Sequence, residues 1–353
     1  MKRSIVDQLA ETIRVAGVHK RPLRIRGGGT KDFYGGALHG EIFDARPYSG
    51  IVDYEPTELV ITARAGTPIA ELENTMRERG QMLAFEPPRF GEPSTLGGCI
   101  AAGLSGPRRP YAGSARDLVL GVRMLDGNGT DLRFGGQVMK NVAGYDVSRL
   151  MVGSLGTLGV LLEISLKALP IPPAEISLRR EHSAPDAIGL MNAWAGKPLP
   201  ITATCHVDGQ LYVRLSGAET AVRAARDRLG GEEVTHGAAF WQQARDHQLR
   251  FFQGPGPLWR ISVRSTSPHL PVPGEQLIEW NGALRWLTGA LDPAAVRDAA
   301  REAGGHATLF RGGNKSDGVF HPLAPALLKL HTRVKKSFDP HGILNSGRLY
   351  PDF

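Results

Sequence analysis

The amino-acid sequence predicts an α+β fold in two domains. Its 353 residues exceed the size at which a single hydrophobic core usually stops growing. Strand-like and helix-like apolar patterns recur in both halves of the chain. Between the halves, Pro170, Pro172 and Pro173 interrupt any regular element. We therefore expect one domain over residues 1–170 and a second, smaller domain after them.

The first domain combines amphipathic helices with short strands. Residues 1–18 carry apolar side chains at helical spacing. Thr67 is placed to cap a second helix, which Gly80 ends. The turn sequence of residues 126–129 (DGNG) lies between two β-rich runs and predicts a hairpin. Strands are expected over residues 23–26, 51–54, 58–64, 118–125, 130–134 and 157–169, and a further helix over 141–151.

The second domain again alternates strands and helices. Strands are expected over residues 201–207, 211–215, 258–263, 284–287 and 307–310, and helices over 218–229, 293–303 and 323–338. This order suits an α+β domain built on an antiparallel sheet.

Three glycine-rich runs in the first half are the main functional signal. They are residues 26–31 (RGGGTK), 93–107 (PSTLGGCIAAGLSGP) and 153–159 (GSLGTLG). Glycine reaches positive φ without a steric cost and has no Cβ, so such runs can curl their N–H groups around an anion. One run alone fits a tight surface turn equally well, but three together indicate the walls of a site for a long diphosphate cofactor.

The individual candidates come from all three runs. They are Arg26, Gly27, Gly28, Gly29, Thr30 and Lys31 in the first run, Pro93, Ser94, Thr95, Gly97, Gly98, Gly103, Ser105 and Gly106 in the second, and Gly153, Ser154, Gly156, Thr157 and Gly159 in the third. The residues after Gly29 break the dinucleotide fingerprint GxGxxG, and residues 312–316 (GGNKS) lack the spacing of a Walker A loop. The phosphate binder is therefore of another kind.

These runs, with residues 140–169, resemble the FAD-binding domain of the vanillyl-alcohol oxidase and p-cresol methylhydroxylase (PCMH) flavoprotein superfamily. Within it, the chain is most similar to the E subunits of bacterial glycolate oxidase. Residues 338–350 (FDPHGILNSGRLY) add a second family-like signature. The resemblance implies a PCMH-type FAD-binding domain over 1–170, an α+β cap domain over 171–337, and a tail of 338–353 that returns to the FAD domain.

FAD also fits the residues themselves. Its pyrophosphate needs clustered N–H donors and cations, which residues 26–31 supply. The resemblance places the segment that holds Asn141, Gly144 and Tyr145 near the flavin, although Tyr145 and Asp146 could equally be the aromatic residue and the cap at the start of a helix. Some superfamily members tether FAD through a histidine near the first glycine loop. Thr30 and Lys31 follow the glycines here, so we expect non-covalent FAD.

Residues for oxidation of a 2-hydroxy acid are harder to find. Such a reaction needs a base near the hydroxyl and cations for the carboxylate. The histidine-glycine-histidine motif of related catalytic subunits is absent, and His321, His331 and His341 have no metal-site spacing, so no metal is expected. Arg311, Lys315 and His321 are the best substrate-facing candidates, and a polar loop is the alternative reading. Leu155 replaces the glutamate common in the third run of related dehydrogenases, which favours the E subunit.

Charge and targeting signals set further limits. The net charge is +7, but the positive residues are dispersed, which argues against a nucleic-acid partner. Cys99 and Cys205 are too few for an iron–sulfur or zinc site and suit a reducing compartment. The sequence has no signal-peptide core and no apolar stretch near the roughly 20 residues of a membrane span. We expect a cytoplasmic protein that reaches the membrane, if at all, through a partner.

The functional expectation is an FAD-binding subunit of a glycolate oxidase, which oxidises glycolate to glyoxylate together with a second flavoprotein subunit and an iron–sulfur subunit. Two alternatives stay open. One is a self-contained FAD-dependent 2-hydroxy-acid dehydrogenase, and the other is a flavin-stabilised assembly subunit without a redox role.

Overall fold

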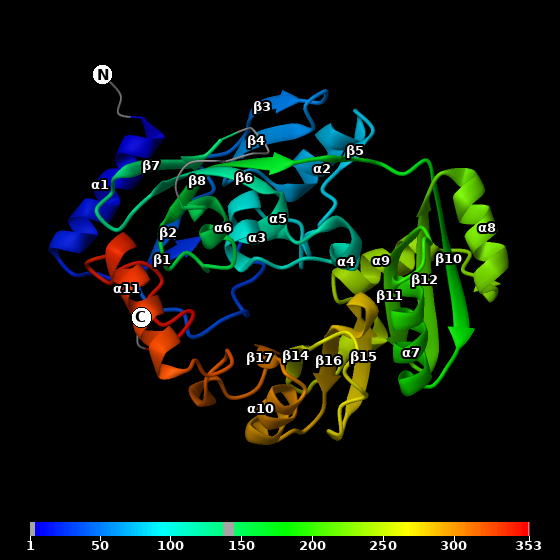
Figure 1. Ribbon diagram of the computed structural model, residues 1–353. Coiled ribbons are helices and arrows are strands. Elements are labelled where there is room, and N and C mark those ends of the chain that lie inside the picture. The colour runs from blue at the N-terminus through cyan, green and yellow to red at the C-terminus, as the bar shows by residue number, and fades with distance from the viewer. Residues whose placement is uncertain (1–3, 137–144, 352) are drawn as a thin grey trace.

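The computed structural model describes residues 4–136, 145–351 and 353 (Figure 1). The first domain is built on a five-stranded antiparallel sheet in the order β3-β4-β8-β6-β7. These strands are β3 (Ile51–Glu55), β4 (Val60–Arg64), β8 (Val160–Lys167), β6 (Val119–Leu125) and β7 (Asp131–Gly135). The pair β6 and β7 confirms the predicted hairpin. Two smaller pairs join β1 (Leu23–Arg26) with β2 (Glu41–Asp44) and β5 (Gln81–Met82) with β9 (Leu169–Pro170).

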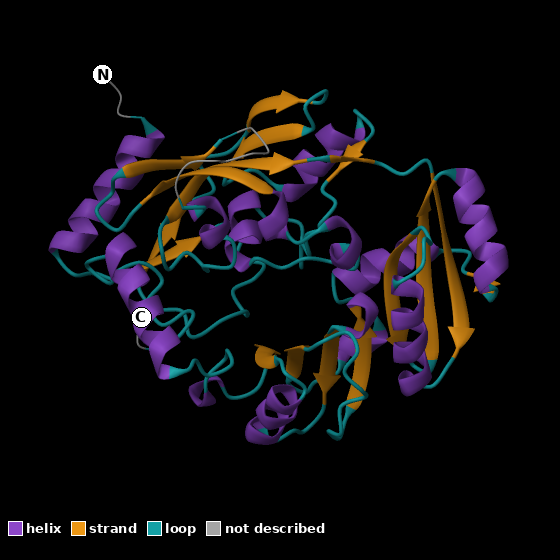
Figure 2. Cartoon of the chain, viewed as in Figure 1, coloured by secondary structure: helices purple, strands orange, loops and turns teal. Residues whose placement is uncertain are grey.

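Helices cover one face of this sheet (Figure 2). The helices of the first domain are α1 (Ile5–Val18), α2 (Ile69–Arg77), α3 (Leu96–Ala102), α4 (Arg109–Ala112), α5 (Ala115–Leu118) and α6 (Val147–Met151). The apolar face of α2, together with α3, fills the core beneath the strands. The expectation that Thr67 caps α2 is wrong, because its hydroxyl bonds with the backbone of Gly50 and Pro68 occupies the cap position.

The second domain is an eight-stranded antiparallel sheet with helices on it. In sheet order the strands are β13 (Glu232–Glu233), β10 (Ala174–Glu181), β12 (Gln210–Gly217), β11 (Ile201–Val207), β15 (Glu275–Glu279), β16 (Leu284–Thr288), β14 (Leu258–Ser262) and β17 (His306–Arg311). The helices are α7 (Ala184–Ala195), α8 (Glu219–Leu229), α9 (Gly237–Arg245) and α10 (Pro293–Glu302). The antiparallel α+β character predicted for this domain is confirmed.

An aromatic-rich core joins the two domains. It unites Tyr34, Leu104 and Leu155 of the first with Trp286 and Phe310 of the second. This shared core packs the two domains together. The segments that carry the glycine runs lie between the two sheets (Figure 1).

The last helix brings the chain back to the first domain. In α11 (Pro325–Phe338), Val334 and Phe338 pack against the core of the five-stranded sheet. Lys335 is buried and donates to the carboxylate of Asp339 and to the carbonyls of Thr157 and Leu344. This ammonium thus ties α11 to the third glycine run and to the tail. Contacts with the first domain begin within α11, and the division at 170 and 337 stays our proposal.

Candidate cofactor site

The first glycine run begins where β1 ends. Gly27 and Gly28 run so close to the second run that no side chain would fit, because a Cβ on Gly28 would lie 1.5 Å from the Pro93 carbonyl oxygen and one on Gly27 would lie 2.3 Å from Thr95 Oγ1. Gly29 has φ of +74°. Glycine is therefore required here for close approach and for the left-handed turn.

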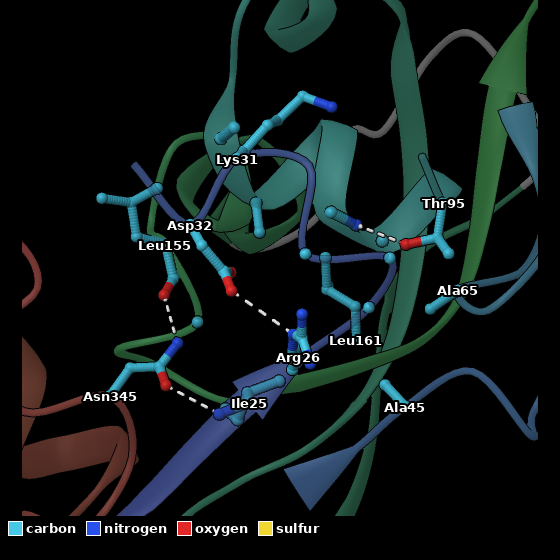
Figure 3. A pocket seen from close by; sticks show the side chains of 18 of the residues that line it. Ile25, Arg26, Lys31, Asp32, Ala45, Ala65, Thr95, Leu155, Leu161 and Asn345 are labelled. Atoms are coloured by element: carbon cyan, nitrogen blue, oxygen red, sulfur yellow. Dashed lines mark hydrogen bonds and ion pairs between the residues drawn. The ribbon is translucent and has the colours of Figure 1, made fainter. Parts of the chain in front are cut away.

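All three glycine runs border one cleft, which is open to solvent (Figure 3). The described residues that line it are Ile25, Arg26, Gly27, Gly28, Gly29, Thr30, Lys31, Asp32, Leu38, Ala45, Ala65, Thr95, Gly97, Gly98, Ala101, Ala102, Leu155, Gly156, Gly159, Leu161, Asn345 and Arg348.

The first wall carries free hydrogen-bond donors. The backbone N–H groups of Gly27, Gly28, Gly29 and Thr30 find no acceptor among the described residues. Partly buried N–H groups are normally satisfied by protein, water or ligand. Four successive donors in one turn form the kind of nest that binds an anion.

The charge of the cleft is positive. Arg26, Lys31 and Arg348 line it together with one carboxylate, Asp32, which pairs with Arg26 at 3.3 Å and with Arg24. Burial lowers the pKa of Arg348 to about 10, so this guanidinium stays protonated at neutral pH. The excess of cations suits a diphosphate.

Lys31 is held by the second run. Its Nζ donates to Ser94 Oγ at 2.9 Å and lies 3.4 Å from Cys99 Sγ. Ser94 is buried and does not line the cleft, but its hydroxyl accepts a hydrogen bond from Lys31 and so positions the ammonium. Thr95 begins α3, and its Oγ1 accepts from the N–H of Gly98.

The third wall is fastened by the tail of the chain. Asn345 donates from Nδ2 to the Leu155 carbonyl at 2.6 Å and accepts the N–H of Ile25 at Oδ1 at 2.8 Å (Figure 3). Gly156, which follows Leu155, has φ of +73°. Arg348 donates to the carbonyls of Tyr34 and Gly36 beyond the first run. The tail thus fixes the first and third walls relative to each other.

The candidates from the sequence divide into three groups. Arg26, Gly27, Gly28, Gly29, Thr30, Lys31, Thr95, Gly97, Gly98, Gly156 and Gly159 line the cleft, whereas Pro93, Ser94, Gly103, Ser105, Gly106, Tyr145, Gly153, Ser154 and Thr157 do not. Asn141 and Gly144 lie outside the described residues. Several residues of the second group support the walls: Thr157 accepts from Lys335, and the backbones of Gly103 and Gly153 meet. Tyr145 is 95% exposed.

The three substrate-facing candidates lie apart from the cleft. Lys315 donates to the carbonyls of Phe33 and Gly35, which links the second domain to the segment after the first glycine run. Arg311 donates to the Phe252 carbonyl, and His321 Nδ1 accepts from the N–H of Ala307. Burial lowers the pKa of all three side chains.

Sequence reasoning did not single out Asp32, Asn345 and Arg348. A signal existed for the last two, because both belong to the tail signature of residues 338–350. Asp32 directly follows the first run, and its role as partner of Arg24 and Arg26 depends on the turn geometry.

The described residues form neither a metal site nor a membrane span. No three His, Cys, Asp or Glu side chains within them gather as metal ligands would. None of their helices combines the length and apolar character needed to cross a bilayer.

Comparison with known proteins defines the class first. Residues 4–135 match the family described as "FAD binding domain". The fold resembles p-cresol methylhydroxylase with a TM-score of 0.69 at 15% identity, covering 99% of this chain and 88% of that one. It also resembles alkyldihydroxyacetonephosphate synthase with a TM-score of 0.65 at 16% identity, covering 96% and 74%. The chain thus carries an FAD-binding domain and shares the fold of p-cresol methylhydroxylase.

Sequence relatives narrow the class. The chain is 52% identical to glycolate oxidase subunit GlcE of Escherichia coli K12 over 98% of its own length and 97% of the relative. It therefore belongs to the GlcE family of glycolate oxidase subunits. It is also 29% identical to glycolate oxidase subunit GlcD of Bacillus subtilis, over 56% of this chain and 42% of that one.

Proposed function

We propose that this chain is the FAD-binding subunit of a glycolate oxidase complex that oxidises glycolate to glyoxylate. One observation carries the proposal: three glycine-rich runs converge on one cationic cleft in a chain 52% identical to a glycolate oxidase subunit. Bound FAD would supply the ring system that accepts a hydride from a hydroxy acid.

The residues of the cleft fit FAD. The N–H groups of Gly27 to Thr30 would bind the pyrophosphate, and Arg26 and Lys31 would balance its charge. Ala65, Leu155 and Leu161 offer apolar surface to a flat ring. The protein's part is to hold and orient the cofactor.

We propose that FAD is held without a covalent bond. The described lining of the cleft contains no histidine, cysteine or tyrosine, the usual side chains that could tether a flavin, and Thr30 and Lys31 follow the glycines. Acid precipitation of the purified chain should release the yellow chromophore into the supernatant. Flavin that stays in the pellet would contradict this part of the proposal.

We also propose two partners, a second flavoprotein subunit and an iron–sulfur subunit. The relative GlcE is named as a subunit. Cys99 and Cys205 are both buried and free, and two cysteines cannot bind an iron–sulfur cluster that needs four. Such a cluster would have to belong to a partner. We place the complex in the cytoplasm, with any membrane contact made through the partners.

Activity assays separate this proposal from its alternatives. With glycolate and an artificial acceptor, the chain alone should show near-background rates and the co-expressed complex robust rates. Among the described residues that line the cleft, the one carboxylate, Asp32, is paired with Arg24 and Arg26 and is therefore a poor general base. Full activity of the lone chain would establish the self-contained dehydrogenase, with Arg311, Lys315 and His321 as the first residues to substitute. A flavin that glycolate leaves oxidised even in the complex would indicate an assembly subunit.

A further inference from the structure

The first half of α11 is exposed on nearly all sides. Of residues 325–333, all but Leu328 are exposed, and Leu328 is half-buried. The other end of the helix is anchored, because Val334 and Phe338 pack against the core of the first domain and Lys335 is buried. Residues 325–333 therefore form a projecting segment at the edge of the molecule (Figure 1).

Two leucines distinguish this projecting segment from an ordinary solvated helix. Leu327 and Leu330 are 49% and 54% exposed, and neither belongs to a hydrophobic cluster of the described residues. At helical spacings of i, i+3 and i+7, they lie on one row with Val334, which packs against the core. Short helices gain most of their stability from packing of the apolar row. Two leucines left in water at the end of that row therefore indicate a surface that another molecule covers.

The opposite face of α11 is uniformly positive. Lys329, Arg333 and Lys336 are exposed and form a second row, at spacings of four and three residues. None of them forms an ion pair with a residue in the described part of the chain, and the sequence has no acidic residue between Asp317 and Asp339. The projecting segment thus offers leucines on one side and only cations on the other. This pattern fits a protein groove with an apolar floor and an acidic wall.

The tail of the chain connects this segment to the cofactor cleft. His331 lies near the rings of Tyr350 and Phe353, with ring centres 6.4 and 6.1 Å away. Arg348, two residues before Tyr350, lines the cleft. A protein bound to the projecting segment would therefore lie beside the wall of the cofactor site that the tail builds.

We propose that residues 325–333 dock into a groove of a partner subunit of the glycolate oxidase complex, a groove with an apolar floor that receives Leu327 and Leu330 and an acidic wall that faces Lys329 and Arg333. The inference rests on the proposed function and adds to it the surface through which this chain joins the complex.

A membrane surface fits the segment less well. An interfacial helix turns its apolar face away from its own protein and into the lipid. Leu327 and Leu330 instead share the row of Val334, which turns toward the core of the first domain. A protein groove can enclose a projecting helix from this side, whereas a flat bilayer cannot.

Photocrosslinking tests the contact within the assembled complex. The full chain, with p-benzoylphenylalanine in place of Leu330, is co-expressed with the second flavoprotein subunit and the iron–sulfur subunit. Irradiation should join it to a partner subunit, at an apolar segment flanked by aspartate or glutamate. The control places the same amino acid at Val52, which is 46% exposed on β3, away from α11 (Figure 1), and should give no such product. A product with lipid or with a second copy of this chain, or no product at all, would overturn the inference.

Variants separate the apolar from the charged contact, with the purified partner subunits binding to the immobilised full chain. Leu327→Ala combined with Leu330→Ala should weaken binding by about tenfold or more, chiefly through faster dissociation. Lys329→Glu combined with Arg333→Glu should slow association at low salt and reduce its dependence on salt. The matched control is Arg228→Glu, an exposed position on α8 at the other end of the molecule (Figure 1); it should change binding by less than about twofold.

The outcomes separate this inference from the proposed function. The substituted residues of α11 lie outside the lining of the cleft, so each variant should keep the FAD content of the wild type, which also reports its folding. Wild-type affinity for the partner subunits in both double variants would overturn the inference alone. A wild-type chain that binds no FAD, or that binds neither partner subunit, would contradict the proposed function itself.

Discussion

Replacement of Gly28 by alanine should remove FAD while the fold persists. The added Cβ would lie 1.5 Å from the Pro93 carbonyl oxygen, where real contacts are essentially never under 3.0 Å. The first and second glycine runs would have to separate by about 1.5 Å, and a displacement of that size breaks a hydrogen bond of ordinary length.

The expected loss follows from the donors that move. Each N–H that bonds to a charged phosphate contributes about 1.5–3 kcal/mol. Misplacing two of the four free donors would cost about 3–6 kcal/mol, which corresponds to a dissociation constant for FAD raised roughly 10²- to 10⁴-fold. Total stability of a domain is about 5–15 kcal/mol, and the clash is confined to one loop contact, so circular dichroism should stay native.

Flavin fluorescence quenching on titration of FAD into the apoprotein measures this constant. The matched control is Gly189→Ala in α7, where the same methyl group meets nothing within 4 Å, and it should leave FAD affinity unchanged. Gly28→Ala with a dissociation constant within about threefold of wild type would refute the reasoning, because the loop would then tolerate what the geometry forbids.

Three other substitutions test the supports of the site and the buried carboxyl. Gly156→Val should also abolish FAD retention with the cap domain folded, because its φ of +73° strains a branched side chain and its Cβ would lie 2.7 Å from Asn345 Nδ2; full FAD content on purification would contradict it. Lys335→Met should lower the free energy of unfolding in urea by about 3–5 kcal/mol, because it leaves Asp339 buried without its partner. The control Lys336→Met, at an exposed position, should leave the free energy of unfolding nearly unchanged, and equal effects of the two substitutions would count against the buried pair. Burial raises the pKa of Glu279 from 4.5 to about 7, so between these pH values the folded state holds a proton that the unfolded state has lost. The free energy of unfolding should therefore fall as pH rises from about 4.5 to 7, by at most about 3 kcal/mol. Glu279→Gln should flatten this pH dependence, and an unchanged slope would exclude Glu279 as its source.

Secondary structure could be predicted from the sequence where it depends only on neighbouring residues. The hairpin at residues 126–129 (DGNG) and the helix α2 were both predicted and confirmed, because hairpins and amphipathic helices follow from neighbouring residues. The strand β10 and the helix α7 were not predicted. β10 begins directly after the prolines of the boundary, and charged residues interrupt its alternation; Pro185 and Gly189 weaken the helical signal of α7.

The site shows the same limit. Glycine runs predicted a cleft, because their composition reports close backbone approach directly. The contacts of Asn345 with Ile25 and Leu155 could not be predicted, since they join segments 320 and 190 residues apart.

The fastening of the cleft by Asn345 has a consequence for how the protein is made. Ribosomes deliver the first glycine run early and Asn345 more than three hundred residues later, so the nascent chain exposes an open, cationic loop for most of its synthesis. Stable FAD binding is then a late step in the synthesis of the protein, and a chain truncated before the tail would fail to retain flavin. The yellow colour of the purified protein would in this sense report full-length translation.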